Sequence, residues 1–360
     1  MKRRVVLSAF LIFLVTVLIS CSGGDGKKTT HRTRELFVAN PLTSTITVFG
    51  ASAHGDVTPL RAFGGLTGLS LPKGVAIDTK NNEIFVVNAL NYTVTVFART
   101  AMGNTAPLRT ISGALTSLNE PVSIAVDPVH DEIFVGNYGG LVTVYARTAT
   151  GNVPPLRSIS GDATGLMGGR IRVAVDTIHN ELLALNDGSG TISFFPRTAN
   201  GNVLPIRTIS GVYGGLSIAF DTLNNEIFVG TYSSVVVYAR TASGNEAPLR
   251  TLAGDSTGLG WAAGIAVDPA NDEIYVANNR ADQNSITVYQ RASSGNMPPK
   301  RTLSGDLTGI TLPLSIAADT INNEIMIGHE NDSLTVYERT AYGNTPPIRT
   351  IVMTPYLKNT

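Results

Sequence analysis

One unit of about 48 residues is repeated along the whole chain. Its clearest part reads Arg-Thr-Ala-x-Gly-Asn-x-x-Pro-x-Arg, with a degenerate first copy. The copies end at arginines spaced 43 to 51 residues apart: Arg61, Arg109, Arg157, Arg207, Arg250, Arg301 and Arg349. A repeat of this length indicates a solenoid, a propeller or an array of small units.

The second unit shows how each repeat divides into four strands. Residues 74–78 are short and apolar, residues 83–88 form a continuous apolar run, residues 93–97 alternate in polarity, and residues 107–111 are the most polar. Continuous apolar runs indicate strands that are buried on both faces, whereas alternation indicates a half-buried strand. This gradient predicts a propeller blade, in which the inner strands lie between neighbouring blades and the outer strand meets water.

The count of strands predicts the number of blades. Seven second strands start at a glutamate, from Glu35 to Glu324, but only six first strands precede them. We therefore expect an all-β propeller of seven four-stranded antiparallel blades over residues 35–360, with six or eight blades as alternatives. The residues directly before Glu35 are too charged for an inner strand. The first blade is thus expected to have three strands, or to be completed by the tail after Arg349.

The residues of the second unit also carry a family resemblance. Pro72-Lys-Gly-Val-Ala-Ile-Asp78, Glu83-Ile-Phe-Val-Val-Asn88 and Thr93-Val-Thr-Val-Phe97 resemble the NHL repeat and the related YVTN-type repeats of bacterial propellers. The resemblance implies the propeller fold. It does not imply one function, because such propellers include lyases, lactonases, sensors and adhesion proteins. The additional Gly-Asn hairpin marks a distinct branch.

The N-terminal segment is interpreted separately from the repeats. Residues 1–21 have a basic start and an apolar run shorter than a spanning helix, and they end in Leu18-Ile-Ser-Cys21, which resembles the bacterial lipoprotein box. That resemblance implies cleavage before Cys21, the single cysteine of the chain, and its lipidation. Residues 22–34 are then a flexible tether. We expect a lipid-anchored, extracytoplasmic protein of the bacterial cell envelope, with Ser22 favouring the outer membrane if the cell is Gram-negative.

Composition excludes several classes of function. The formal net charge is zero and 15% of residues are charged, which argues against nucleic acid as a partner. The sequence after Cys21 has no cysteine, and its histidines fall at unrelated positions, so we expect neither a metal site nor another cofactor. We identify no nucleophile elbow, phosphate loop or pair of carboxylates in catalytic spacing, and therefore no catalytic residue.

Two features recur in nearly every unit and are interpreted as structural. A glutamate at the start of the second strand and an arginine after the third, such as Glu83 and Arg99, are expected to form an exposed cross-strand pair within each blade. Asparagines such as Asn88 end the second strands, where they are expected to bond local backbone amides. Thr231 and His329 replace asparagine there.

The candidates for a ligand site are mostly positions that break the repeat. The strand order predicts that they share one face, formed by the loops between second and third strands and between blades. The candidates are Arg170, Arg172, Tyr213, Tyr232, Trp261, Asn278 and His329. The Gly-Asn hairpins, with Asn104 and Asn152, are expected to project from the opposite face.

Two functions remain open from the sequence. The first is a binding or scaffold lipoprotein that recognises a protein or glycan partner, since aromatic side chains stack on sugars and anchor protein interfaces. The alternative is a propeller hydrolase or lyase of the lactonase kind, acting on a small molecule at the channel mouth. Arg170, Arg172, Asn278 and His329 would surround that mouth.

Overall fold

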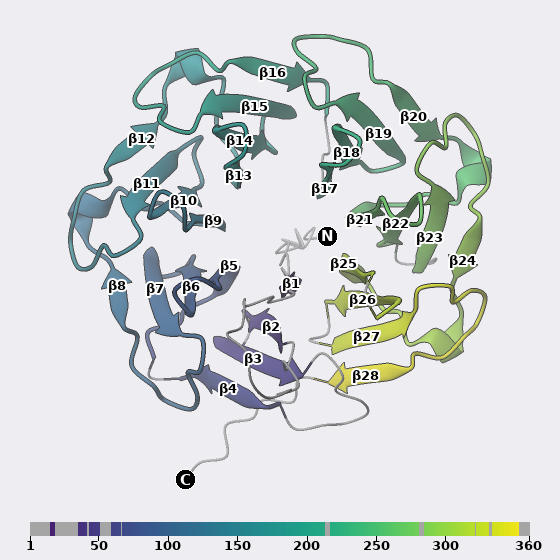
Figure 1. Cartoon of the computed structure of the whole chain (residues 1–360), viewed down its shortest axis with the longest axis horizontal. Coiled ribbons are helices and arrows are strands. Elements are labelled where there is room, and N and C mark those ends of the chain that lie inside the picture. Colours follow the sequence, from purple (N-terminus) through teal and green to yellow (C-terminus); the bar gives the residue numbers. More distant parts are fainter. Residues whose placement is uncertain are drawn as a thin grey trace, which may run out of the picture.

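The computed structural model describes residues 15–18, 35–41, 43–50, 59–65, 67–212, 217–280, 284–320, 322–330 and 333–352. These residues form seven four-stranded antiparallel sheets, arranged as blades around a central axis (Figure 1). The expected all-β, seven-bladed propeller is therefore confirmed. Cys21, Tyr213 and the tail after Val352 lie outside the described residues.

Every blade runs from the axis to the rim in chain order. The innermost strands are β1 (Val15–Leu18), β5 (Pro72–Asp78), β9 (Ser123–Asp127), β13 (Ile171–Asp176), β17 (Ser217–Asp221), β21 (Ala262–Asp268) and β25 (Pro313–Asp319). The second strands are β2 (Glu35–Asn40), β6 (Glu83–Asn88), β10 (Glu132–Gly136), β14 (Glu181–Asn186), β18 (Glu226–Gly230), β22 (Glu273–Asn278) and β26 (Glu324–His329).

The two remaining strands of each blade lie toward the rim. The third strands are β3 (Thr45–Gly50), β7 (Thr93–Ala98), β11 (Val142–Ala146), β15 (Thr191–Pro196), β19 (Ser234–Ala239), β23 (Ser285–Gln290) and β27 (Ser333–Glu338). The outer strands are β4 (Arg61–Gly64), β8 (Arg109–Ile111), β12 (Arg157–Ile159), β16 (Arg207–Ser210), β20 (Arg250–Ala253), β24 (Arg301–Leu303) and β28 (Arg349–Val352). Within the described ranges, four short 3₁₀ helices follow outer strands: η1 (Ala114–Thr116), η2 (Asp162–Thr164), η3 (Asp255–Thr257) and η4 (Asp306–Thr308).

The innermost strand of the first blade comes from a segment that was not expected to join the fold. Strand β1 pairs with β2 from Val15 opposite Val38 to Leu18 opposite Glu35. Its Val-Thr-Val-Leu sequence has the β-branched side chains that suit a strand, and β2 offers an open backbone edge. Cleavage before Cys21 would remove β1 and leave this blade with three strands.

The core lies between the blades. Each of the seven junctions between neighbouring blades contains its own cluster of buried hydrophobic side chains. At the last junction, Val38 and Phe49 of the first blade pack with Met326 and Val336 of the seventh, so the ring is closed. This arrangement explains why the second strands read as continuous apolar runs, since both of their faces contact a neighbouring sheet.

The repeated charges link neighbouring blades, which corrects the expected pairing within one blade. Glu83 accepts two hydrogen bonds from Arg109, the first residue of its own outer strand, at 2.9 and 2.8 Å. Its second arginine is Arg147 of the following blade, at 2.6 Å. Arg99 instead reaches back to Glu35 of the first blade. Glu83 thus binds one arginine of its own outer strand and one arginine that follows the third strand of the next blade.

The Gly-Asn hairpins, which were expected to project from the face opposite the loops, also join neighbouring blades. The amide N–H of Gly151 donates to the carbonyl of Thr110 on the preceding outer strand, at 2.6 Å. The side-chain oxygen of Asn152 then accepts from the N–H of Leu115 in η1, at 2.8 Å. Unpaired backbone groups at the rim thus gain partners from the next blade.

Candidate functional site

A pair of aromatic rings lies on the loop face between the fifth and sixth blades. Tyr232, in the loop between β18 and β19, and Trp261, directly before β21, stack with ring centroids 5.6 Å apart and planes 26° from parallel. They line a pocket of about 350 Å³ together with Ser233, Leu259, Gly260, Asn279 and Arg280. The structure thus brings together two residues that are 29 positions apart in sequence and that both break the repeat.

Hydrogen bonds of the neighbouring strands hold both aromatic residues in place. The carbonyl of Trp261 accepts from the N–H of Asn279 at 2.8 Å. On the other side of the pocket, the hydroxyl of Thr231 accepts from the N–H groups of Ser233 and Ser234, so that Tyr232 sits in a closed turn. The half-exposed Tyr232 ring is therefore presented by a rigid loop.

Asn278 supports this pocket from inside the blade. Its side chain is 1% exposed, donates to Ser285 and Thr287, and accepts from the N–H of Gly260 at 3.1 Å. The asparagine thereby fixes the loop that leads into Trp261. It is enclosed, so it positions the loop and leaves contact with a ligand to the aromatic rings.

His329 occupies the equivalent place in the seventh blade and makes equivalent bonds. Its Nε2 lies 2.7 Å from the hydroxyl of Thr335, and its Nδ1 lies 3.4 Å from the N–H of Thr311. Burial lowers the pKa of His329 to about 4, so the ring is neutral at pH 7. A neutral imidazole supplies one donor and one acceptor, as the asparagine amide does. His329 therefore takes over the structural role that asparagine has at this position in other blades.

A second group of candidates lies at the inner strand of the fourth blade. Arg172 is on β13, and its Nη1 atom is buried without a hydrogen-bond partner. Burial lowers the pKa of its guanidinium, against the attraction of Asp187, and neighbouring Arg170 lowers it further. The N–H of Arg170 donates to the carboxylate of Asp187 at 2.6 Å. Together they form a positively charged site beside the axis.

A larger cavity of about 620 Å³ lies between the sixth and seventh blades, and the sequence did not reveal it. It is lined by polar side chains such as Asn284, Thr302 and Asp306, and by backbone of η4 and the following loop. The Oδ1 atom of Asn284 is buried without a partner there. These serines, threonines and glycines recur in other units, so no departure from the repeat marked them.

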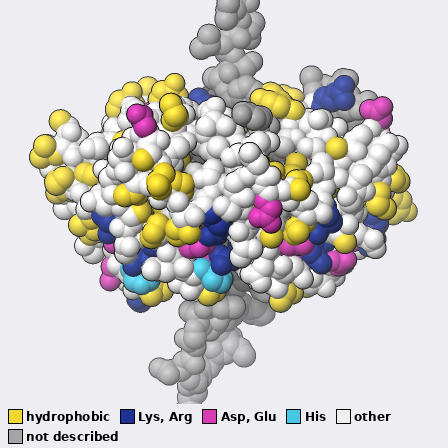
Figure 2. Space-filling view, turned by 90° about the horizontal axis from the view of Figure 1, so that it is seen from above, with side chains coloured by type: hydrophobic (Ala, Val, Ile, Leu, Met, Phe, Trp, Pro, Cys, Tyr) yellow, Lys and Arg dark blue, Asp and Glu magenta, His cyan; other side chains and the backbone are white. Residues whose placement is uncertain are grey.

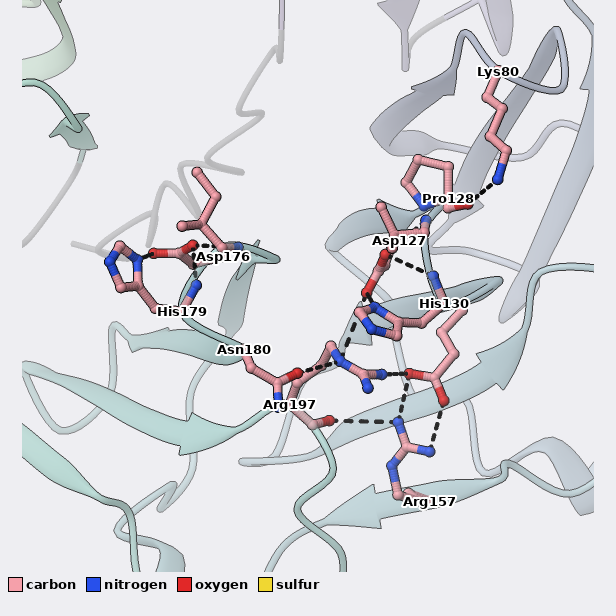
Figure 3. Close-up of polar contacts among 12 residues, drawn as sticks. Lys80, Asp127, Pro128, His130, Arg157, Asp176, His179, Asn180 and Arg197 are labelled. Carbon is pink, nitrogen blue, oxygen red and sulfur yellow. Dashed lines mark hydrogen bonds and ion pairs between the residues drawn. The ribbon is translucent and has the colours of Figure 1, made fainter.

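No group of three or more His, Cys, Asp or Glu side chains in the described ranges is arranged to hold a metal ion. His130 and His179, which lie in turns on the face opposite the pockets, are each bonded to an aspartate of their own turn. Nδ1 of His130 lies 2.7 Å from Asp127, and Nδ1 of His179 lies 2.7 Å from Asp176 (Figure 3).

Comparison with known families supports the architecture. A family model described as "Lactonase, 7-bladed beta-propeller" matches residues 43–179, which span the second and third blades and parts of their neighbours. Comparison with curated proteins gives no match. The family match and the seven four-stranded sheets agree that this chain contains a β-propeller domain similar to the lactonase type.

Proposed function

We propose that this chain is a lipid-anchored binding module of the bacterial envelope, whose loop face recognises a glycan. The stacked pair of Tyr232 and Trp261 supports this proposal most directly, because an aromatic face beside a pocket is suited to packing against a sugar ring. Ligand pockets begin at roughly 300 Å³, so the 350 Å³ available here accommodates one sugar unit of a larger chain. Asn279 and Arg280 add polar groups at its edge.

Anchoring is proposed on the sequence around Cys21. Acylation of the thiol and the new amine exceeds the single chain that gives marginal binding, so attachment would be stable. No helix among the described residues is long and apolar enough to cross a membrane. Cys21→Ser is expected to release the protein from the membrane fraction. Retention of this variant after a salt wash would contradict lipid anchoring.

The binding proposal has a direct optical test, because Trp261 is the single tryptophan of the chain. Oligosaccharides from envelope polymers are titrated into the purified full-length protein in detergent while its tryptophan emission is recorded. We expect saturable quenching or a spectral shift, lost in Tyr232→Ala. An unchanged emission with every glycan, together with capture of a protein that Trp261→Ala abolishes, would identify a protein partner in place of the glycan.

A second candidate is a lactonase-like hydrolase or lyase. The buried, unpartnered Nη1 of Arg172 favours it, because such a group suits the carboxylate or phosphate of an anionic substrate, and the family match supports it as well. His329 is enclosed and bonded within its blade, which removes one candidate base. Hydrolysis of anionic lactones that is lost in Arg172→Ala, with stoichiometric divalent metal in the protein, would favour the enzyme.

A further inference from the structure

The face opposite the pockets carries three exposed apolar side chains at one position of the repeat. Val129, Ile178 and Leu223 occupy the turns between the first and second strands of three consecutive blades, and they are 67%, 85% and 73% exposed. We call this side the turn face. We propose that the turn face rests on the lipid bilayer and that these three side chains enter its interfacial layer, a proposal that depends on the lipid anchor at Cys21.

The turns hold these side chains outward. In each turn, the aspartate that ends the inner strand accepts a hydrogen bond from the N–H of the apolar residue. The distances are 2.9 Å for Val129 to Asp127, 3.0 Å for Ile178 to Asp176 and 3.0 Å for Leu223 to Asp221. Figure 3 shows this construction for Asp127 and Asp176. These bonds fix the backbone of each turn, and in the folded structure the three apolar side chains are exposed.

Neighbouring turns lie side by side on this face. Lys80 of the second blade donates from its Nζ to the carbonyl of Pro128 in the turn of the third, at 2.9 Å (Figure 3). The turns at one end of a ring of blades lie in about the same plane. A flat bilayer can therefore contact several of them at once. In the side view, the histidine side chains lie toward one side of the disc with hydrophobic side chains beside them (Figure 2).

Apolar side chains at the rim are also exposed, but they are not arranged to enter one flat bilayer together. Leu108, Leu156 and Ile206 precede the outer strands and are about equally exposed, at 55%, 55% and 53%. They point outward around a curved circumference, so a plane that touches one blade moves away from the next. They also recur in most blades. Apolar residues that are spread around the whole rim do not favour one orientation of the protein on the membrane.

The position of the anchor selects the turn face independently. Strand β2 begins at Glu35, which has the same place in its blade as Glu132, directly after the turn of the third blade. A tether of 13 residues, 22–34, separates it from Cys21. Such a chain has an end-to-end distance of roughly 20 Å, about the length of one strand. A flexible tether of this length would keep the turn face near the membrane and the Trp261 pocket directed away from it.

Cysteine labelling tests this orientation, because Cys21 is the single natural cysteine and its thiol is acylated in the anchored protein. Ile178→Cys on the turn face, Leu90→Cys on the loop face and Leu156→Cys at the rim are each labelled with an environment-sensitive fluorophore. Leu90, at 71% exposure, is the matched control. The full-length proteins are reconstituted into phosphatidylethanolamine–phosphatidylglycerol vesicles, some of which contain a lipid-borne quencher.

We expect a blue-shifted emission and at least twofold quenching for the label at Ile178→Cys, with little change at Leu90→Cys and Leu156→Cys. Equal quenching at all three positions, or stronger quenching at Leu90→Cys, would overturn the proposed orientation. Flotation of the unlabelled protein with the vesicles is measured in parallel. Failure to float would reject the anchor itself, whereas flotation without quenching at Ile178→Cys rejects only the turn face.

Discussion

Arg147 of the third blade and Glu83 of the second form an ion pair with an Nη1–Oε2 distance of 2.6 Å. The same carboxylate is held by Arg109 of its own blade, so one glutamate connects the rim of its sheet to the next sheet. Six of the seven glutamates in this position have arginine partners on both sides within the described residues. Among the described residues Glu324 pairs with Arg349 alone, so the charged link between blades is not seen at the junction of the seventh and first blades.

Glu83→Gln is expected to destabilise the protein by about 1–3 kcal/mol, because two partly buried arginines lose their charged partner. Urea denaturation followed by circular dichroism measures the change. Lys73→Ala is the control, since it removes the more exposed pair with Glu120 and should cost under about 1 kcal/mol. A smaller effect for Glu83→Gln than for Lys73→Ala would contradict the linking role.

His329→Asn is expected to keep stability within about 1 kcal/mol of the natural protein. The amide can bond Thr335 and the Thr311 N–H, as Asn278 bonds Thr287 and the Gly260 N–H. His329→Ala removes both bonds and leaves a cavity, at a cost of about 2–4 kcal/mol. Thermal unfolding compares the two variants. If asparagine is as damaging as alanine, the proposed equivalence is wrong.

The same histidine should make the fold sensitive to acid. Burial lowers its pKa from the ordinary value of 6.5 to about 4 in the folded protein, so the unfolded chain binds the proton first as pH falls. Its contribution to stability is complete above pH 6.5 and decreases between pH 6.5 and 4, by a few kcal/mol at most. Comparing the natural protein with His329→Asn at each pH isolates this effect. Parallel pH profiles would contradict it.

Asn152→Ala should lower the stability by about 0.5–2 kcal/mol, because the N–H of Leu115 in η1 loses its acceptor. Asn104→Ala is the matched control at the same repeat position, and the described residues give its side chain no hydrogen bond of this kind. Both variants are expected to leave ligand binding unchanged, since these hairpins lie at the rim. If Asn152→Ala abolishes ligand binding without lowering the stability, the ligand binds at the Gly-Asn hairpins and the loop face is the wrong assignment.

Trp261→Ala and Arg172→Ala are expected to weaken ligand binding by at least tenfold while the melting temperature falls by only a few degrees. Trp261 is partly exposed, and the Nη1 atom of Arg172 is buried without a hydrogen-bond partner, so truncation of either side chain is expected to leave the packing of the blades in place. Calorimetric melting and binding are measured on the same preparations. A large fall in the melting temperature with unchanged affinity would show that both residues stabilise the fold and do not bind the ligand.

The sequence alone determined the architecture, because each repeat carries its own burial gradient and hence its own four strands. It also placed Tyr232 and Trp261 on one face, since strand order decides which loops share a side. The tertiary structure decided which partners meet. Arg147 pairs with Glu83 and not with Glu132, because propeller closure brings the end of one third strand to the rim of the preceding blade. His329 similarly departs from the repeat in sequence but not in its bonds, and only its buried surroundings show that an imidazole takes the place of an amide.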